Sequence, residues 1–163
     1  MKTLYTIMTL VFILYVTYIR IYFGKLPSIS DSWYKLKFKP LFTLFCWGFA
    51  IPAMLLGFEL AENTPYQFII FLAASGILFV GTAPDFKAEQ GLDRKVHYIG
   101  ALVGIIGILL YQYLVFTQYW YITLLFTVLM ILSLIFKRKI NEIFWIEIFA
   151  FSSYMINVLL IIK

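Results

Sequence analysis

The sequence predicts an all-α, polytopic membrane protein, a bundle of about six transmembrane helices that forms a single domain over residues 1–163. Of its residues, 63% are hydrophobic and only 13% are charged, whereas globular chains carry about 25% charged residues. The apolar stretches run to about 20 residues, enough to cross a membrane as a helix. They lack the polar alternation of a membrane β-barrel, and the backbone must be hydrogen-bonded within hydrocarbon, so helices are favoured.

Charged residues and prolines divide the chain into six apolar segments that we expect to span the membrane. These lie near residues 4–22, 41–58, 66–83, 97–116, 118–136 and 143–162. The first segment follows Lys2 and superficially resembles a signal peptide, but no small-residue cleavage site follows it, so we expect a retained helix. The fourth contains Gly100 and Gly104 in a GxxxG spacing, which we expect to pack helices closely within the bundle.

Lysines and arginines are distributed unequally between the two sides of the predicted membrane. With six spans, the first, third and fifth connections share one face, which carries eleven basic residues: Arg20, Lys25, Lys35, Lys37, Lys39, Lys87, Arg94, Lys95, Lys137, Arg138 and Lys139. The other face has only Lys2 and Lys163. Because cytoplasmic loops retain positive charge, we expect both termini outside the cytoplasm. The basic belt can meet anionic lipids, so the net charge of +5 implies no nucleic-acid partner.

The polar residues that could form a site lie at the expected cytoplasmic ends of the spans or within the last span: Ser28, Ser30, Asp31, Asp85, His97, Glu147, Ser153 and Asn157. At 100° per residue, Ser153 and Asn157 share an arc of the last helix with Glu147 at its margin, and this arc should face the bundle. An ionisable residue within a span indicates a functional site by default. Alternatively, Glu147 lies near the interface and reaches water or the basic residues at 137–139.

A hydroxyl, an imidazole and carboxylates at one membrane surface could also catalyse acyl hydrolysis or transfer on a lipid. In that hypothesis Ser28 or Ser30 is the nucleophile, His97 is the base, and Asp31 or Asp85 orients the imidazole.

The same residues have structural interpretations. The two serines can cap the second span or form a turn with Asp31, and His97 can bond to Asp85 or Asp93 at the boundary of its span. Metal chemistry is limited by ligand supply, because the chain has one histidine and one cysteine, Cys46, which cannot build a His-rich zinc site. We therefore expect no metal and no other cofactor.

Two short motifs resemble those of the DRAM/FRAG family of six-span membrane proteins. Residues 27–31 (PSISD) match a P-x-I-S-D segment after the first helix, and residues 97–101 (HYIGA) match an H-x-x-G-A segment that opens a later one. The family includes autophagy modulators and a Golgi protein needed for lipid remodelling of GPI anchors. The resemblance implies that Ser28, Ser30 and Asp31, together with His97, are functional positions, and it places the I-S-D loop on the luminal side, opposite to the charge count.

A more distant likeness is to the CREST membrane hydrolases, the ceramidase group, whose metal-binding histidines this chain lacks. Of the functions left open, we favour a bundle that binds a lipid head group or a membrane-protein partner, with homo-oligomers possible, and does no chemistry. The alternative is the metal-independent lipid hydrolase or transferase described above. A third function is a channel or transporter that uses Glu147 and Asn157.

Overall fold

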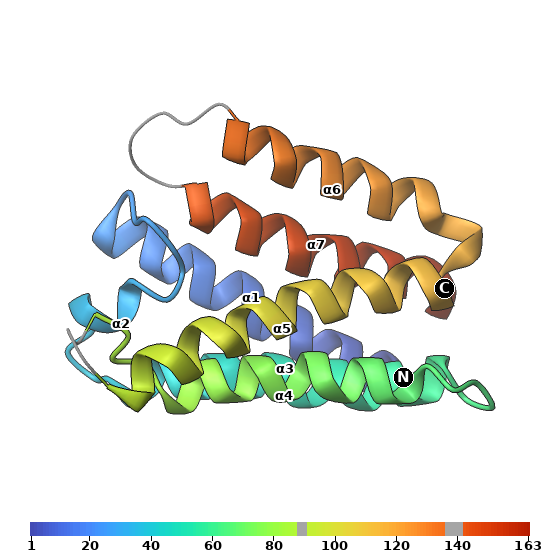
Figure 1. Ribbon diagram of the computed structural model, residues 1–163, viewed down its shortest axis with the longest axis horizontal. Coiled ribbons are helices and arrows are strands. Elements are labelled where there is room, and N and C mark those ends of the chain that lie inside the picture. Colours follow the sequence, from blue (N-terminus) through green and yellow to red (C-terminus); the bar gives the residue numbers. More distant parts are fainter. Residues whose placement is uncertain (88–90, 136–141) are drawn as a thin grey trace.

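The computed structural model describes residues 1–87, 91–135 and 142–163, and these residues form helices joined by turns and irregular segments, without strands (Figure 1). The long helices are α1 (Lys2–Phe23), α3 (Pro40–Leu60), α4 (Gln67–Thr82), α5 (Leu92–Val115), α6 (Trp120–Ile135) and α7 (Glu142–Ile162). The short ones are α2 (Ser32–Lys35) and the 3₁₀ turn η1 (Thr117–Tyr119). The expected all-α bundle is therefore confirmed.

Five of these helices are long and apolar enough to cross a membrane: α1, α3, α5, α7, and α6 together with η1. With 16 residues, α4 is about 24 Å long, less than the roughly 30 Å hydrocarbon core of a bilayer. Each expected span corresponds to one helix. The largest difference is at α5, which begins at Leu92 rather than near residue 97. Charged residues such as Arg94 and Lys95 are good helix formers and extend α5 beyond its apolar run.

The chain runs back and forth along the bundle axis. In Figure 1 the connection at residues 24–39 and residues 83–87 after α4 lie at one end, whereas both termini and the connection at residues 61–66 lie at the other. The described connections therefore alternate between the two ends of the bundle, as assumed when the basic residues were assigned to the two faces. The basic residues at 137–139, considered above as partners of Glu147, lie outside the described residues.

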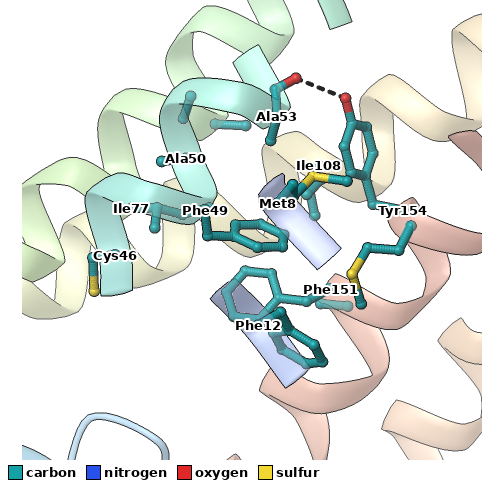
Figure 2. Close-up of a cluster of buried hydrophobic side chains, with 14 of the residues drawn as sticks. Met8, Phe12, Cys46, Phe49, Ala50, Ala53, Ile77, Ile108, Phe151 and Tyr154 are labelled. Atoms are coloured by element: carbon teal, nitrogen blue, oxygen red, sulfur yellow. Dashed lines mark hydrogen bonds between the residues drawn. The ribbon is translucent and has the colours of Figure 1, made fainter. Parts of the chain in front are cut away.

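The core forms where α1, α3 and α7 meet (Figure 2). There the rings of Phe12, Phe49 and Phe151 pack with centroids 4.6–5.9 Å apart. Beside them, the Tyr154 hydroxyl on α7 donates a 2.8 Å hydrogen bond to the carbonyl of Ala53 on α3 (Figure 2). This carbonyl belongs to the α3 backbone, so the bond fixes the position of α7 along the axis of α3. Helix α7 also contacts α5, while α6 packs mainly on α7 at the edge of the bundle.

Helices α4 and α5 make the most extensive helix contact among the described elements, and glycines permit their backbones to approach closely. A Cβ atom added at Gly76 would lie 2.5 Å from the Gly100 carbonyl oxygen and 2.8 Å from the Gly104 nitrogen. Backbone therefore meets backbone at this crossing, as small residues allow in membrane helices. The GxxxG motif packs helices within the bundle, which confirms the expectation from the sequence.

Candidate functional site

The loop between α1 and α2 is closed by a local hydrogen-bonded turn. The Ser28 hydroxyl donates to Asp31 Oδ2 at 2.8 Å and accepts from the Asp31 backbone N–H at 3.0 Å. Ser32, one residue further, bonds through its hydroxyl to that of Tyr15 on α1 at 2.6 Å. Ser28, Asp31 and Ser32 are all buried, so this turn, anticipated as the structural interpretation of Ser28, holds the loop against the bundle.

Glu147 ties the same loop to α7. Its Oε2 accepts the Ile29 backbone N–H at 2.5 Å, and its Oε1 lies 3.5 Å from the Ser30 hydroxyl, a weaker contact. A third bond runs the other way, from the Phe144 N–H in the first turn of α7 to the Pro27 carbonyl at 2.9 Å. The first N–H groups of a helix have no hydrogen-bond partner within it. The loop supplies a carbonyl for one such N–H group of α7, and the Glu147 carboxylate in turn accepts a backbone N–H of the loop.

His97 is buried beneath the segment that follows α4. Its Nδ1 lies 2.9 Å from the Ala83 carbonyl oxygen, and its ring stacks on Phe86 with centroids 4.3 Å apart. A carbonyl only accepts hydrogen bonds, so the neutral ring carries its proton on Nδ1. The structural interpretation gave His97 an aspartate partner, Asp85 or Asp93, whereas in the structure the partner is a backbone carbonyl.

Asp85 accepts a 3.0 Å hydrogen bond from the Tyr34 hydroxyl, which itself accepts the Lys87 backbone N–H at 2.7 Å. Burial, together with the neighbouring Asp85 carboxylate, raises the pKa of Tyr34 to about 12. These bonds hold residues 83–87 against α2.

Ser28, Ser30, Asp31, His97 and Glu147 meet in one cavity of about 450 Å³, which we call the polar cleft. The structure thus brings together five of the eight residues proposed from the sequence. Seven further residues line it that the sequence analysis did not propose for the site, and among them are Lys87, Arg94 and Tyr98. There Lys87 and Arg94 were assigned to the basic belt, which orients the chain and can meet anionic lipids. Asp85 is not among the lining residues.

Charges of both signs line the polar cleft. The Asp31 Oδ1 atom pairs with Lys87 Nζ, while Arg94 lies over the ring of Tyr98 at 5.9 Å. Glu147 and Asp31 supply two carboxylates, and Lys87 and Arg94 supply two cations. The described lining therefore has a formal charge balance of zero, with the acids on the loop and α7 and the cations at the beginning of α5 and just before it.

A second, smaller cavity of about 40 Å³ lies deeper in the bundle. Its walls are largely apolar and include Phe49 and Phe151. It shares Ser30, Ala101 and Glu147 with the polar cleft. The polar cleft and the smaller apolar cavity thus adjoin at these three residues.

Ser153 and Asn157 belong to a separate, fully buried network. The Gln112 Oε1 atom on α5 accepts from the Ser153 hydroxyl at 2.7 Å and from Asn157 Nδ2 at 2.8 Å, and Asn157 Nδ2 also lies 3.0 Å from Thr123 Oγ1 on α6. Glu147 lies at the margin of the arc that contains Asn157, and Asn157 lies ten residues further along α7, about 15 Å deeper. Sequence reasoning missed Gln112, although a single amide in an apolar span is a recognisable signal. The network joins α5, α6 and α7 as polar residues do in membrane bundles.

In the described contacts, neither serine hydroxyl is hydrogen-bonded to His97. A serine nucleophile needs a hydrogen bond to its base, but Ser28 donates to Asp31, Ser30 points to Glu147, and His97 faces a carbonyl. In the described part of the chain, no group of three histidine, cysteine, aspartate or glutamate residues could hold a metal.

The fold and the site define a class of protein, a helical bundle with five candidate membrane-spanning helices and a polar cleft at one end. No known protein family, curated protein or solved structure matches the chain. The resemblance to the DRAM/FRAG and CREST groups stays a prediction.

Proposed function

We propose that this chain is a six-span integral membrane protein whose polar cleft binds the head group of a membrane lipid without changing it chemically. One observation carries the proposal. The polar cleft, at the end of the bundle, adjoins an apolar cavity at Ser30, Ala101 and Glu147. A site with polar groups outside and apolar walls inside suits an amphiphile, because each part of the ligand meets matching groups.

The position of the cleft agrees with this proposal. It is built from the loop at residues 24–31, residues 86 and 87 and the first turns of α5 and α7, all at the same end of the bundle (Figure 1). Helices of 16–24 residues are about 24–36 Å long, close to the hydrocarbon thickness of a bilayer. In a membrane the cleft then lies at the level of the head groups, which reach it without leaving the interface.

The charge bias orients this end toward the cytoplasm. A reporter fused after Lys163 tests the orientation: alkaline phosphatase should be active there and green fluorescent protein should be dark, because the C-terminus is expected outside the cytoplasm. The opposite pattern would place the cleft on the luminal side, as the DRAM/FRAG resemblance implies.

Filling the boundary between the two cavities tests the binding function. In the Ala101→Phe variant an aromatic ring occupies the point where the cavities adjoin, whereas Leu102→Phe adds a similar ring at a side chain that is 59% exposed on the outer face of α5. We expect native mass spectrometry of the chain, extracted in mild detergent, to show bound lipid in the wild type and the Leu102→Phe control. The bound fraction should fall several-fold in Ala101→Phe.

Circular dichroism of both variants checks that the helices remain folded. Equal lipid retention by folded Ala101→Phe, or a wild-type chain that carries only a protein partner, would contradict the proposal.

A further inference from the structure

The charges of the polar cleft are arranged in two groups. Asp31 lies on the loop and Glu147 on α7, whereas Lys87 follows α4 and Arg94 lies in the first turn of α5. Among the described lining residues the two signs balance. A head group with a net negative charge would face two carboxylates, and one with a net positive charge would face two cations, so either leaves charge without compensation.

We propose that the head group bound in the polar cleft is a zwitterion with a primary ammonium group and a phosphate, of the phosphoethanolamine type. This inference rests on the proposed function and specifies its ligand. The ammonium binds at Asp31 with the Ser30 and Glu147 oxygens near it, and the phosphate binds at Arg94 and Lys87.

The ion pair between Lys87 and Asp31 provides a way to admit such a ligand. Both residues line the cleft, and the Lys87 side chain is 54% exposed, so it can move while Asp31 is held by Ser28. The ammonium takes the place of Lys87 at Asp31, and Lys87 turns to the phosphate. Every charge that loses a partner gains another, which avoids the cost of leaving a buried charge unpaired.

The cleft suits a primary ammonium better than a trimethylammonium. Carboxylate and hydroxyl oxygens at Asp31, Ser30 and Glu147 accept hydrogen bonds from N–H groups, which a quaternary amine does not have. Quaternary amines are instead held by the faces of aromatic rings. The two rings that line the cleft are already engaged, since Phe86 stacks on His97 and Tyr98 lies under Arg94.

Competition among three phospholipids with identical acyl chains tests the inference. The purified full-length chain is delipidated and titrated with phosphatidylethanolamine, phosphatidylcholine or phosphatidylglycerol, and bound lipid is counted by native mass spectrometry. We expect phosphatidylethanolamine to bind several-fold more tightly than the other two. Equal or tighter binding of phosphatidylglycerol or phosphatidylcholine would overturn the inference but leave the lipid-binding function standing. Failure of all three to bind would reject both.

Charge substitutions make the test independent of folding defects, because they should change the order of preference as well as the affinity. Asp31→Asn gives the described lining a formal charge of +1, so its preference should shift several-fold toward phosphatidylglycerol. Arg94→Gln gives −1 and should weaken phosphatidylglycerol most.

The matched controls are Asp93→Asn and Lys95→Gln, which alter the charge of the chain equally at exposed positions on α5 outside the cleft lining. The controls should keep the wild-type order of preference. If Asp31→Asn keeps that order too, or if Asp93→Asn shifts it equally, the cleft does not select the head group by charge.

Discussion

Replacing Gly76 by alanine should destabilise the bundle, because the added methyl has no space at the crossing of α4 and α5. Its Cβ would lie 2.5 Å from the Gly100 carbonyl oxygen, where ordinary contact begins at 3.4 Å, a deficit of 0.9 Å. A second backbone atom, the Gly104 nitrogen, lies 2.8 Å away. Neither can move as a side chain can, so one helix must shift away from the other.

The size of the effect follows from two opposing contributions. Overpacking costs about 1–3 kcal/mol, and rigid backbone on both sides places this case near the upper value. Alanine returns about 1 kcal/mol through its higher helix propensity. The net loss of unfolding free energy is therefore about 2 kcal/mol, roughly a 30-fold change in the unfolding equilibrium.

Gly48→Ala on α3 is the matched control. There the added Cβ meets only the side chain of Val11, at 3.3 Å, and the propensity gain should leave stability unchanged or up to about 1 kcal/mol higher. Equilibrium unfolding in mixed micelles, followed by far-ultraviolet circular dichroism, measures both variants. If Gly76→Ala proves as stable as Gly48→Ala, backbone contact between α4 and α5 is refuted.

Three further changes test other contacts. Glu147→Leu leaves the Ile29 N–H unpaired, which should cost about 1–3 kcal/mol and speed hydrogen exchange at that amide; exchange at the wild-type rate would exclude the bond between Glu147 and the loop. Gln112→Leu removes the oxygen that accepts hydrogen bonds from both Ser153 and Asn157. A double-mutant cycle with Ser153→Ala should give a coupling free energy of about 0.6–1.7 kcal/mol. A coupling of zero would argue against the buried hydrogen-bond network around Gln112. Burial raises the pKa of Tyr34 to about 12, so this tyrosine should ionise at a higher pH than an exposed one. Its contribution to stability is therefore complete below pH 10 and is lost as the pH rises toward 12. The difference in tyrosinate absorbance between wild type and Tyr34→Phe measures this ionisation, and a midpoint near pH 10 would contradict the prediction.

The sequence was sufficient to predict the helices, because apolar runs in a weakly charged chain leave few alternatives. It placed most helix ends within a few residues and failed most at α5. There the apolar run begins near His97, but the helix starts at Leu92, since charged residues continue a helix without continuing a hydrophobic pattern. The single turn α2 (Ser32–Lys35) carried no periodic signal.

For the candidate site, the sequence predicted which residues lie near one another but not their hydrogen-bond partners. The loop that carries Ser28 and Asp31 lies at the end of the bundle where α7, with Glu147, begins, so their meeting follows from the topology. Their partners do not, because the Pro27 carbonyl and the Ile29 amide are backbone groups whose directions depend on the loop conformation.

The position of Asn157 outside the cleft has a different origin. A helical arc fixes the angle of a residue around the axis but ignores the rise of 1.5 Å per residue. Asn157 lies about 15 Å beyond Glu147 along α7, and it is therefore outside the cleft that Glu147 lines. Lys87 and Arg94, which line the cleft, were interpreted as part of a basic belt that orients the chain and can meet anionic lipids, and this interpretation did not place them beside the acidic residues of the site.

The central claim, that the polar cleft holds a lipid head group, is tested most directly by an experimental structure of the chain crystallised from a lipid mesophase that contains phosphatidylethanolamine. We predict density for a phosphate near Arg94 and for an amine near Asp31, with the acyl chains leaving the cleft beside Ala101. Lipids ordered on the outer surface while the cleft holds only water would contradict the account.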